Sequence, residues 1–444
     1  MSLILAFRLI WVAVLLYCEI GIYLTPLHLR CFLSSSWTDD GEGGRENGII
    51  IRAAGDAAGC ERVPVITDPQ ITDFFSYGMK VGSASLALTQ YYSDIYMRRA
   101  FPLVLKAAGV RAKHVVVLGD LFDGGRVIAG ESNQQEYEMH MKRICDIFRC
   151  DPGADNKTVG QSGPRLWFIP GNHDVGLGKW SSSAAMSKFA RHFGSPNFIF
   201  SVNSVSFIGI DSISLAGHDP EFEGNVWRTV ADASSHPFAK VLLTHIPLWR
   251  EKGSDCGPWR RKRTLRQGFG VSYQNLLNQE TSANLLGALF PRLHLILSGD
   301  DHDVCVVEHS SLEGRSAVEV TVPTFSWLQG SPQPGFGIIT VCKGERQRQP
   351  AIYSHVCFLP PQLCIFAAYA ILGVAHITAL SIDRCRVIGD GDQTAAMKKV
   401  DGDAHLLAKD KSTKPFFILV ILKEAAIFAG TYFAVCALGE IVSR

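Results

Sequence analysis

The sequence predicts an α/β domain, with a mostly parallel β-sheet covered by helices, carried between membrane-spanning helices at the two ends of the chain. Two observations support this prediction. Between residues 63 and 345, short apolar segments that suit buried strands alternate with longer segments that suit helices. That order produces parallel strands joined by helices. At both ends, apolar stretches reach the length of about 20 residues that a helix needs to cross a bilayer.

Three segments are candidate membrane spans: residues 1–30, 357–382 and 416–440. A cleaved signal peptide is the alternative for the first. Its apolar stretch is longer than the roughly 7–15 residues of a typical signal core, and no clear small-residue cleavage site follows. We therefore predict an uncleaved signal anchor. Residues 383–415, between the second and third spans, carry seven basic side chains, which predicts a cytosolic loop.

The segment between the first two spans is then lumenal. Its residues 31–62 are rich in Ser, Gly, Asp and Glu and are predicted to be a linker, and residues 63–345 form the domain. Asn156 begins a glycosylation sequon, Asn-Lys-Thr, which agrees with a lumenal position. The domain also has an even number of cysteines, which permits disulfides in an oxidising compartment, although ordinary buried thiols are the alternative.

Polar side chains follow five of the predicted strands at the point where each strand ends. Because the carboxyl ends of parallel strands meet at one edge of a sheet, we expect these side chains to converge. They offer carboxylates, amides and imidazoles but no thiolate, which suits paired Mn, Fe or Zn ions better than a soft metal. The candidate side chains are Asp68, Gln70, Asp120, Asn172, His173, His245, Asp300 and His302.

The motifs that contain these residues resemble, in their order, those of the calcineurin-like metallophosphoesterase superfamily. They are "GDLFDGG" at 119–125, "PGNHD" at 170–174, "LTHIP" at 243–247 and "SGDDHD" at 298–303. The resemblance covers about Val63 to Val341 and implies a four-layer α/β/β/α sandwich. Two positions depart from the superfamily pattern. Gln70 stands where Asp-x-His has its histidine, and Asp300 stands where Gly-His-x-His has its first histidine.

The resemblance also implies a role for each residue at two divalent metal ions. Asp68, Gln70 and His302 would hold the first ion. Asn172, His245 and Asp300 would hold the second, and Asp120 would bridge both. Gln70 could instead only hydrogen-bond a ligand. Because amide and carboxylate oxygens replace imidazoles, we expect Mn to be favoured, with Fe or Zn as alternatives.

Three further residues of the motifs have predicted catalytic or supporting roles. His173 is the candidate general acid or phosphate-oxygen donor, and Asp123 and Asp174 would orient it or a metal ligand. Asp301 occupies the variable position of its motif and is expected to be solvated. A basic segment, residues 249–266, could be a lid that meets anionic lipid or phosphate, or a solvated loop.

The departures, together with "CGP" at 256–258, "YQN" at 273–275 and "FSW" at 325–327, resemble one membrane-anchored branch of the superfamily. That branch contains GPI-glycan-remodelling phosphodiesterases and fungal relatives linked to manganese homeostasis and cargo exit. It implies removal of an ethanolamine-phosphate branch from GPI-anchored proteins or the GPI glycolipid, in the endoplasmic reticulum or Golgi membrane, with cargo receptors as possible partners.

Two alternatives remain for the function. One is a lumenal phosphatase that acts on another lipid or sugar phosphate. The other is a non-catalytic protein of cargo exit or manganese homeostasis. The charge balance, 43 Lys and Arg against 42 Asp and Glu, gives no argument for a nucleic-acid partner.

Overall fold

The computed structural model describes residues 3–24, 29–37, 59–109, 112–129, 133–154, 157–217, 220–262, 265, 267–310, 315–344, 350–398 and 413–443. Asn156, the predicted glycosylation site, lies outside these residues. The chain forms two compact units. One comprises residues 1–24 and 362–444, and the other comprises residues 25–361.

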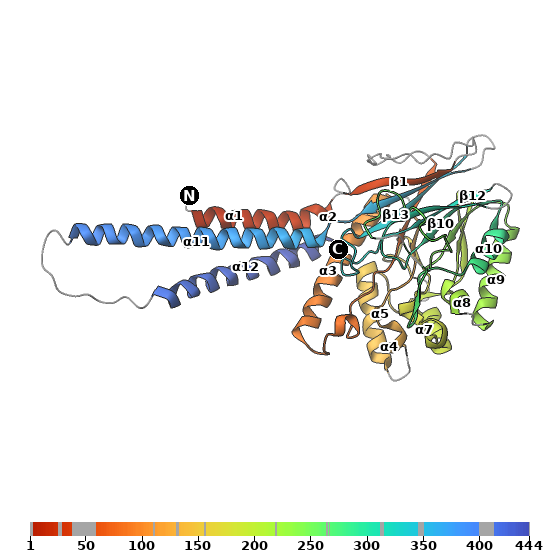
Figure 1. Ribbon diagram of the computed structural model, residues 1–444, viewed down its shortest axis with the longest axis horizontal. Coiled ribbons are helices and arrows are strands. Elements are labelled where there is room, and N and C mark those ends of the chain that lie inside the picture. The colour runs from red at the N-terminus through yellow and green to blue at the C-terminus, as the bar shows by residue number, and fades with distance from the viewer. Residues whose placement is uncertain are drawn as a thin grey trace. The chain divides into compact units, whose positions relative to one another are not determined.

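The larger unit contains two six-stranded sheets (Figure 1). The first has the order β1-β14-β13-β2-β3-β4. Its strands are β1 (Arg30–Trp37), β14 (Ala351–Phe358), β13 (Gly335–Cys342), β2 (Cys60–Ile66), β3 (His114–Val117) and β4 (Arg165–Phe168). The second has the order β11-β12-β10-β7-β6-β5. Its strands are β11 (Cys305–Ser310), β12 (Ser316–Thr321), β10 (Leu293–Ser298), β7 (Ala239–Leu243), β6 (Val205–Gly209) and β5 (Phe198–Val202).

The core of this unit lies between the two sheets, where apolar side chains from both pack into one cluster. Val65 of β2 and Val116 of β3 belong to it, as do Phe207 of β6 and Leu295 of β10. Helices α3 (Ala84–Ala108) and α5 (Gln134–Phe148) lie beside the first sheet, and α9 (Pro220–Ser235) and α10 (Gln279–Leu289) beside the second. The α/β/β/α architecture that the resemblance implied is therefore confirmed.

The strands divide between two mixed sheets, as the sandwich requires, and not within the single, mostly parallel sheet that the alternation of strands and helices suggested. β2, β3 and β4 run parallel, as do β6, β7, β10 and β12. β1, β14 and β13 extend the first sheet with antiparallel pairing, and β5 and β11 pair antiparallel at the edges of the second. Strands joined without an intervening helix can pair antiparallel, whereas parallel neighbours need a crossover.

The first sheet also includes residues outside the predicted domain limits of 63–345. Part of the predicted linker forms β1 and the start of β2, and β14 follows the predicted domain end. Disulfides join these additions to the sheet, since Cys31 pairs with Cys357 and Cys60 with Cys342. Two further disulfides connect Cys145 with Cys150 and Cys256 with Cys305. The alternative of ordinary buried thiols therefore does not hold for these cysteines.

Among its described residues, the smaller unit has three helical segments that are long and apolar enough to cross a membrane: Ile4–Leu24, Gln362–Asp383 and Ile421–Gly439. They lie in α1 (Leu3–Leu16) with the short turns that follow it, in α11 (Gln362–Lys398) and in α12 (Thr413–Ser443). Three ionisable side chains in these segments, Arg8, Glu19 and Glu424, have partners on neighbouring helices. Arg8 pairs with Glu424, and the Tyr369 hydroxyl donates to Glu19 at 2.5 Å. These helices and the disulfides indicate a membrane protein with a lumenal domain.

Candidate metal centre

Residues from five loops converge at the carboxyl edges of the two sheets. Asp68 and Gln70 follow β2, and Asp120 follows β3. Helix α6 (Asn172–Val175), which begins just after β4, carries Asn172 and His173. From the second sheet, His245 follows β7, and Asp300 and His302 follow β10. The predicted convergence of strand ends is therefore observed.

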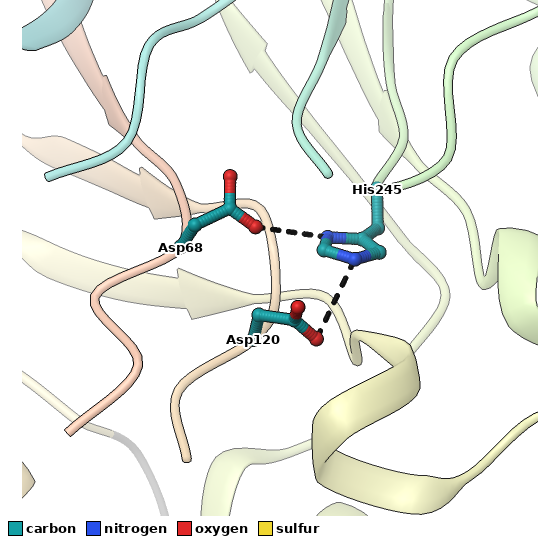
Figure 2. A group of neighbouring side chains, drawn as sticks. All are labelled: Asp68, Asp120 and His245. Carbon is teal, nitrogen blue, oxygen red and sulfur yellow. Dashed lines mark ion pairs between the residues drawn. The ribbon is translucent and has the colours of Figure 1, made fainter. Parts of the chain in front are cut away.

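Asp68, Asp120 and His245 form the centre of this cluster (Figure 2). Each offers one ligand atom, and these atoms lie within 4.8 Å of one another in a fully buried environment. Nδ1 of His245 donates to the carbonyl of Leu118 at 2.6 Å. Nε2 faces the Asp120 carboxylate at 3.5 Å and is the ring nitrogen left available for a metal ion. A hydrogen bond on one ring nitrogen that frees the other is the usual arrangement of a histidine that binds metal.

Further oxygens surround the same nitrogen of His245. Asn172 Oδ1 lies 3.4 Å from Nε2, and Asp300 Oδ1 lies 3.6 Å from it. The amide nitrogen of Asn172 donates to the carbonyl of Ser272 at 2.8 Å, which fixes its oxygen toward His245. The residues predicted to hold the second ion are thus neighbours of one another and of Asp120.

The residues predicted to hold the first ion gather around Asp68. His302 Nε2 lies 3.9 Å from Asp68 Oδ1. Gln70 donates from its amide nitrogen to Asp120 Oδ2 at 2.8 Å, so it does hydrogen-bond a predicted ligand. Burial, with Lys262 nearby, lowers the pKa of His302 to about 4, which leaves its imidazole neutral and able to bind a metal.

The donors fit a divalent cation. Asp68 Oδ1 and Gln70 Oε1 are buried and have no hydrogen-bond partner, an expensive state for polar oxygens in a protein interior. Burial is the main cause that raises the pKa of Asp68 to about 8, with repulsion from Asp120 and Asp300 adding to it. A bound cation would give these two oxygens a partner, and its positive charge would favour the ionised form of the Asp68 carboxylate.

The backbone holds the predicted ligands in unusual conformations. Asp68, Gln70, Asp120, Asp300 and His302 all have positive φ, between 35° and 65°. Non-glycine residues rarely adopt such angles, and they cluster at functional sites where the surrounding structure compensates for the strain.

The glycines of two motifs are required by close packing at this centre. A Cβ atom on Gly119 would lie 2.7 Å from Nδ1 of His245, and one on Gly171 would collide with the carboxylate of Asp120. Only glycine lets the loops that carry Asp120 and Asn172 approach so closely.

His173 lies beside the centre and remains partly exposed, with 29% of its side chain accessible. Its backbone N–H donates to Asp120 Oδ1 at 2.9 Å. Its Nδ1 lies 2.5 Å from the carbonyl oxygen of Asp123 and 3.2 Å from the Asp123 carboxylate. Burial alone would lower the pKa of His173, but Asp120 and Asp123 raise it to about 9. The two acids therefore favour the protonated ring.

Asp174 and Asp123 have different surroundings. Asp174 accepts backbone hydrogen bonds from Leu121 at 2.8 Å and from Gly171 at 2.9 Å, so it ties the loop after β3 to α6. Asp123 contacts the ring of His173 and accepts from the Ser76 hydroxyl. The geometry therefore suits Asp123 for orienting His173 and Asp174 for fixing the loops.

The expectation that Asp301 is solvated is wrong. Its carboxylate forms an ion pair with Arg260, and its side chain is 5% exposed. Asp303 accepts from the backbone N–H groups of Arg261 and Lys262, at 2.8 and 2.6 Å. The two acids therefore anchor residues 260–262 of the basic segment 249–266 beside the metal centre.

Sequence reasoning missed Glu319 of β12, a buried carboxylate beneath the centre. It accepts from the Ser298 hydroxyl at 2.6 Å and from the backbone N–H of Leu248 at 3.2 Å. Arg250 and His309 lie 3.4 and 2.7 Å from it. Glu319 thus connects the loop of His245 with the loop of Asp300. The only sequence signal was a single acid within the apolar segment "AVEVTV".

Carboxylate, amide and imidazole donors at the carboxyl edges of an α/β/β/α sandwich define a metal-dependent phosphoric ester hydrolase, a metallophosphoesterase. The model of the family "Calcineurin-like phosphoesterase" matches residues 65–304, more than half of the chain, and the chain belongs to this family. Members bind divalent metal ions.

Two relatives illustrate how far the similarity extends. The chain is 29% identical over 322 residues to "Cell division control protein 1" of Saccharomyces cerevisiae, an alignment that covers 69% of this chain and 62% of the yeast protein. It is 27% identical over 398 residues to "Metallophosphoesterase 1" of Rattus norvegicus, which covers 83% of this chain and 86% of the rat protein. The second similarity extends well beyond the 65–304 segment.

Proposed function

We propose that the protein is a dinuclear phosphodiesterase of early secretory membranes that removes an ethanolamine-phosphate branch from the GPI glycan. The observation that carries this proposal is the position of Gln70 and Asp300. Both replace an imidazole of the superfamily pattern. Gln70 donates from its amide nitrogen to Asp120, and Asp300 places a carboxylate oxygen 3.6 Å from Nε2 of His245. These are the substitutions by which the sequence resembles the GPI-remodelling branch. The three candidate membrane helices are consistent with a substrate carried by a lipid.

The proposed ligands divide into two sets that share Asp120. Asp68, Gln70 and His302 hold one ion, and Asn172, His245 and Asp300 hold the other. When bound, the ions polarise the phosphoryl group and lower the pKa of the attacking water. The oxygen-rich donor set favours Mn, with Fe or Zn as alternatives. The unpartnered Oε1 of Gln70 supports a direct role as a ligand, in addition to the hydrogen bond to Asp120.

His173 supplies the proton in this proposal. Cleavage of a phosphodiester breaks a P–O bond, forms another to the oxygen of water and leaves an alkoxide that needs a proton. The contacts of Nδ1 with Asp123 fix the orientation of the ring. The partly exposed His173 ring then gives a proton to the leaving oxygen.

Replacing His173 by glutamine is expected to lower kcat on an alkyl phosphodiester by about 10²–10⁴-fold, the usual contribution of general acid catalysis. The loss should be much smaller on bis-p-nitrophenyl phosphate, because p-nitrophenolate leaves readily without a proton. The measurement is kcat of the wild type and of His173→Gln on both esters with Mn²⁺ present. Equal losses on the two substrates would show that His173 is not the proton donor.

The substrate is tested by mass spectrometry of GPI glycans from cells that lack the protein. We expect these glycans to retain one additional ethanolamine-phosphate group. Expression of the wild type should remove it, and expression of Asp120→Asn should not. If loss of the protein leaves the glycan masses unchanged, the GPI assignment is wrong, and another lipid or sugar phosphate is the substrate to seek.

A further inference from the structure

The strands that lead toward the first two candidate spans meet the edge that carries the metal centre. In the first sheet, β13 runs antiparallel to β2, so its first residues lie beside the carboxyl end of β2, with Gly337 opposite Val65. Phe358, the last residue of β14, pairs with Gly335, and Arg30, the first residue of β1, pairs with Phe358. The chain therefore enters and leaves this sheet at the edge from which Asp68 and Gln70 project.

Exposed apolar side chains concentrate on the loops of the same edge. Among the described residues of the larger unit, eleven large apolar side chains are exposed. Eight of them lie between the carboxyl end of β2, β3, β4 or β7 and the next long helix, in loops, short helical turns or a short hairpin. Scattered exposed apolar side chains are ordinary, but their gathering at one edge is not. These eight form what we call the docking rim: Phe75, Tyr77, Val81, Val127, Trp180, Phe269, Val271 and Tyr273.

The docking rim is held by contacts with the metal centre and its neighbouring loops. Val271 adjoins Ser272, whose carbonyl accepts from Asn172 and whose hydroxyl accepts from the N–H of Leu177 at 3.1 Å. The Tyr77 hydroxyl donates to the carbonyl of Leu328 at 2.6 Å. Because these bonds fix the loops, the exposed side chains stand at defined positions around the site.

Cationic side chains lie among the apolar ones. Lys80 directly precedes Val81, and Lys179 lies with its ammonium 5.5 Å from the ring of Trp180. Arg261 is exposed on the segment that Asp303 anchors beside the metal centre. Aromatic and aliphatic side chains mixed with Lys and Arg are typical of surfaces that lie in the interface of a bilayer.

We propose that the docking rim is a membrane-binding surface, on which the apolar side chains enter the headgroup region of the bilayer around the metal centre. The partner that this surface contacts is the lipid bilayer. The chain enters and leaves the first sheet at this edge, and the rim combines apolar and cationic side chains. This surface would hold the site at the depth of a lipid headgroup, whichever phosphoester is cleaved.

The experiment uses full-length protein reconstituted into vesicles of phosphatidylcholine and phosphatidylinositol. The photoreactive residue p-benzoylphenylalanine replaces Val81 or Val271, which are 77% and 73% exposed. The matched control carries it at Phe238, an exposed apolar residue just before the amino end of β7, at the opposite edge. After illumination, mass spectrometry of peptides measures the yield of lipid adducts at each position.

We expect lipid adducts at positions 81 and 271 and no lipid adduct at position 238. Adducts at none of the positions, equal yields at all three, or cross-links to protein in place of lipid would overturn the proposal. Circular dichroism of each variant confirms folding before illumination. Because the readout is contact with lipid and not turnover, the membrane surface and the proposed GPI activity can fail independently of each other.

Discussion

Replacing Asp120 by asparagine is expected to lower kcat on bis-p-nitrophenyl phosphate by at least about 10³-fold. Asp120 lies between the two proposed ligand sets, since Oδ1 faces His245 and Oδ2 accepts from Gln70. Metal clamping of a phosphoryl group supplies several kcal/mol of transition-state stabilisation, and about 1.4 kcal/mol corresponds to tenfold in rate. The measurement combines kcat with the metal content of the purified protein by elemental mass spectrometry.

The matched control is Glu308→Gln, which removes a carboxylate on the exposed side of β11, outside the proposed ligand sets. This variant should keep its bound metal, whereas Asp120→Asn should lose at least one ion. Undiminished metal content and turnover in Asp120→Asn would exclude it as the bridging ligand.

The second large effect concerns stability. Replacing Glu319 by glutamine is expected to lower the free energy of unfolding of the larger unit by roughly 3–5 kcal/mol, because Arg250 is left as an unpaired charge in the interior. Arg250 and Glu319 have side chains that are 2% and 0% exposed. The measurement is a urea titration of the detergent-solubilised full-length protein, followed by tryptophan fluorescence. Glu308→Gln, on the exposed side of the neighbouring strand β11, is the control and should change stability little.

The effect of Glu319 should also depend on pH. Burial alone would raise the pKa of Glu319, but Arg250 and His309 hold it below its usual value of 4.5. A carboxyl whose pKa is depressed by folding adds stability above its unfolded pKa, and this stability is lost as the pH falls through the folded value. The difference between wild type and Glu319→Gln should therefore shrink as the pH falls below 4.5. A difference that is constant across this range would contradict the ionised pair.

The sequence was most informative where a strand leads directly into a polar loop. The placement of Asp120 and His245 follows from local strand prediction and from the rule that carboxyl ends of parallel strands share an edge. No long-range pairing needs to be known. The residues of the cluster could therefore be named before any coordinates, and the structure places them together.

Long-range pairing was the information that the sequence lacked. β1 pairs with β14 across a disulfide between residues separated by 326 positions, and its Ser-rich stretch is typical of a linker. Similarly, Asp300 and Asp301 are consecutive acids, yet one faces His245 and the other faces Arg260. Asp300 has a left-handed backbone conformation, which separates the directions of the two side chains. The residue types alone do not predict this conformation.

The disulfide between Cys31 and Cys357 has a consequence for proteolytic processing. Cys31 lies just after the first candidate span, and Cys357 lies just before the second. If a protease cut the peptide bond at any point from residue 38 to residue 58, the N-terminal fragment would remain covalently attached to the rest of the chain. Release of the domain from the first candidate span by a cut in this range would require reduction of this bond as well as cleavage of the backbone.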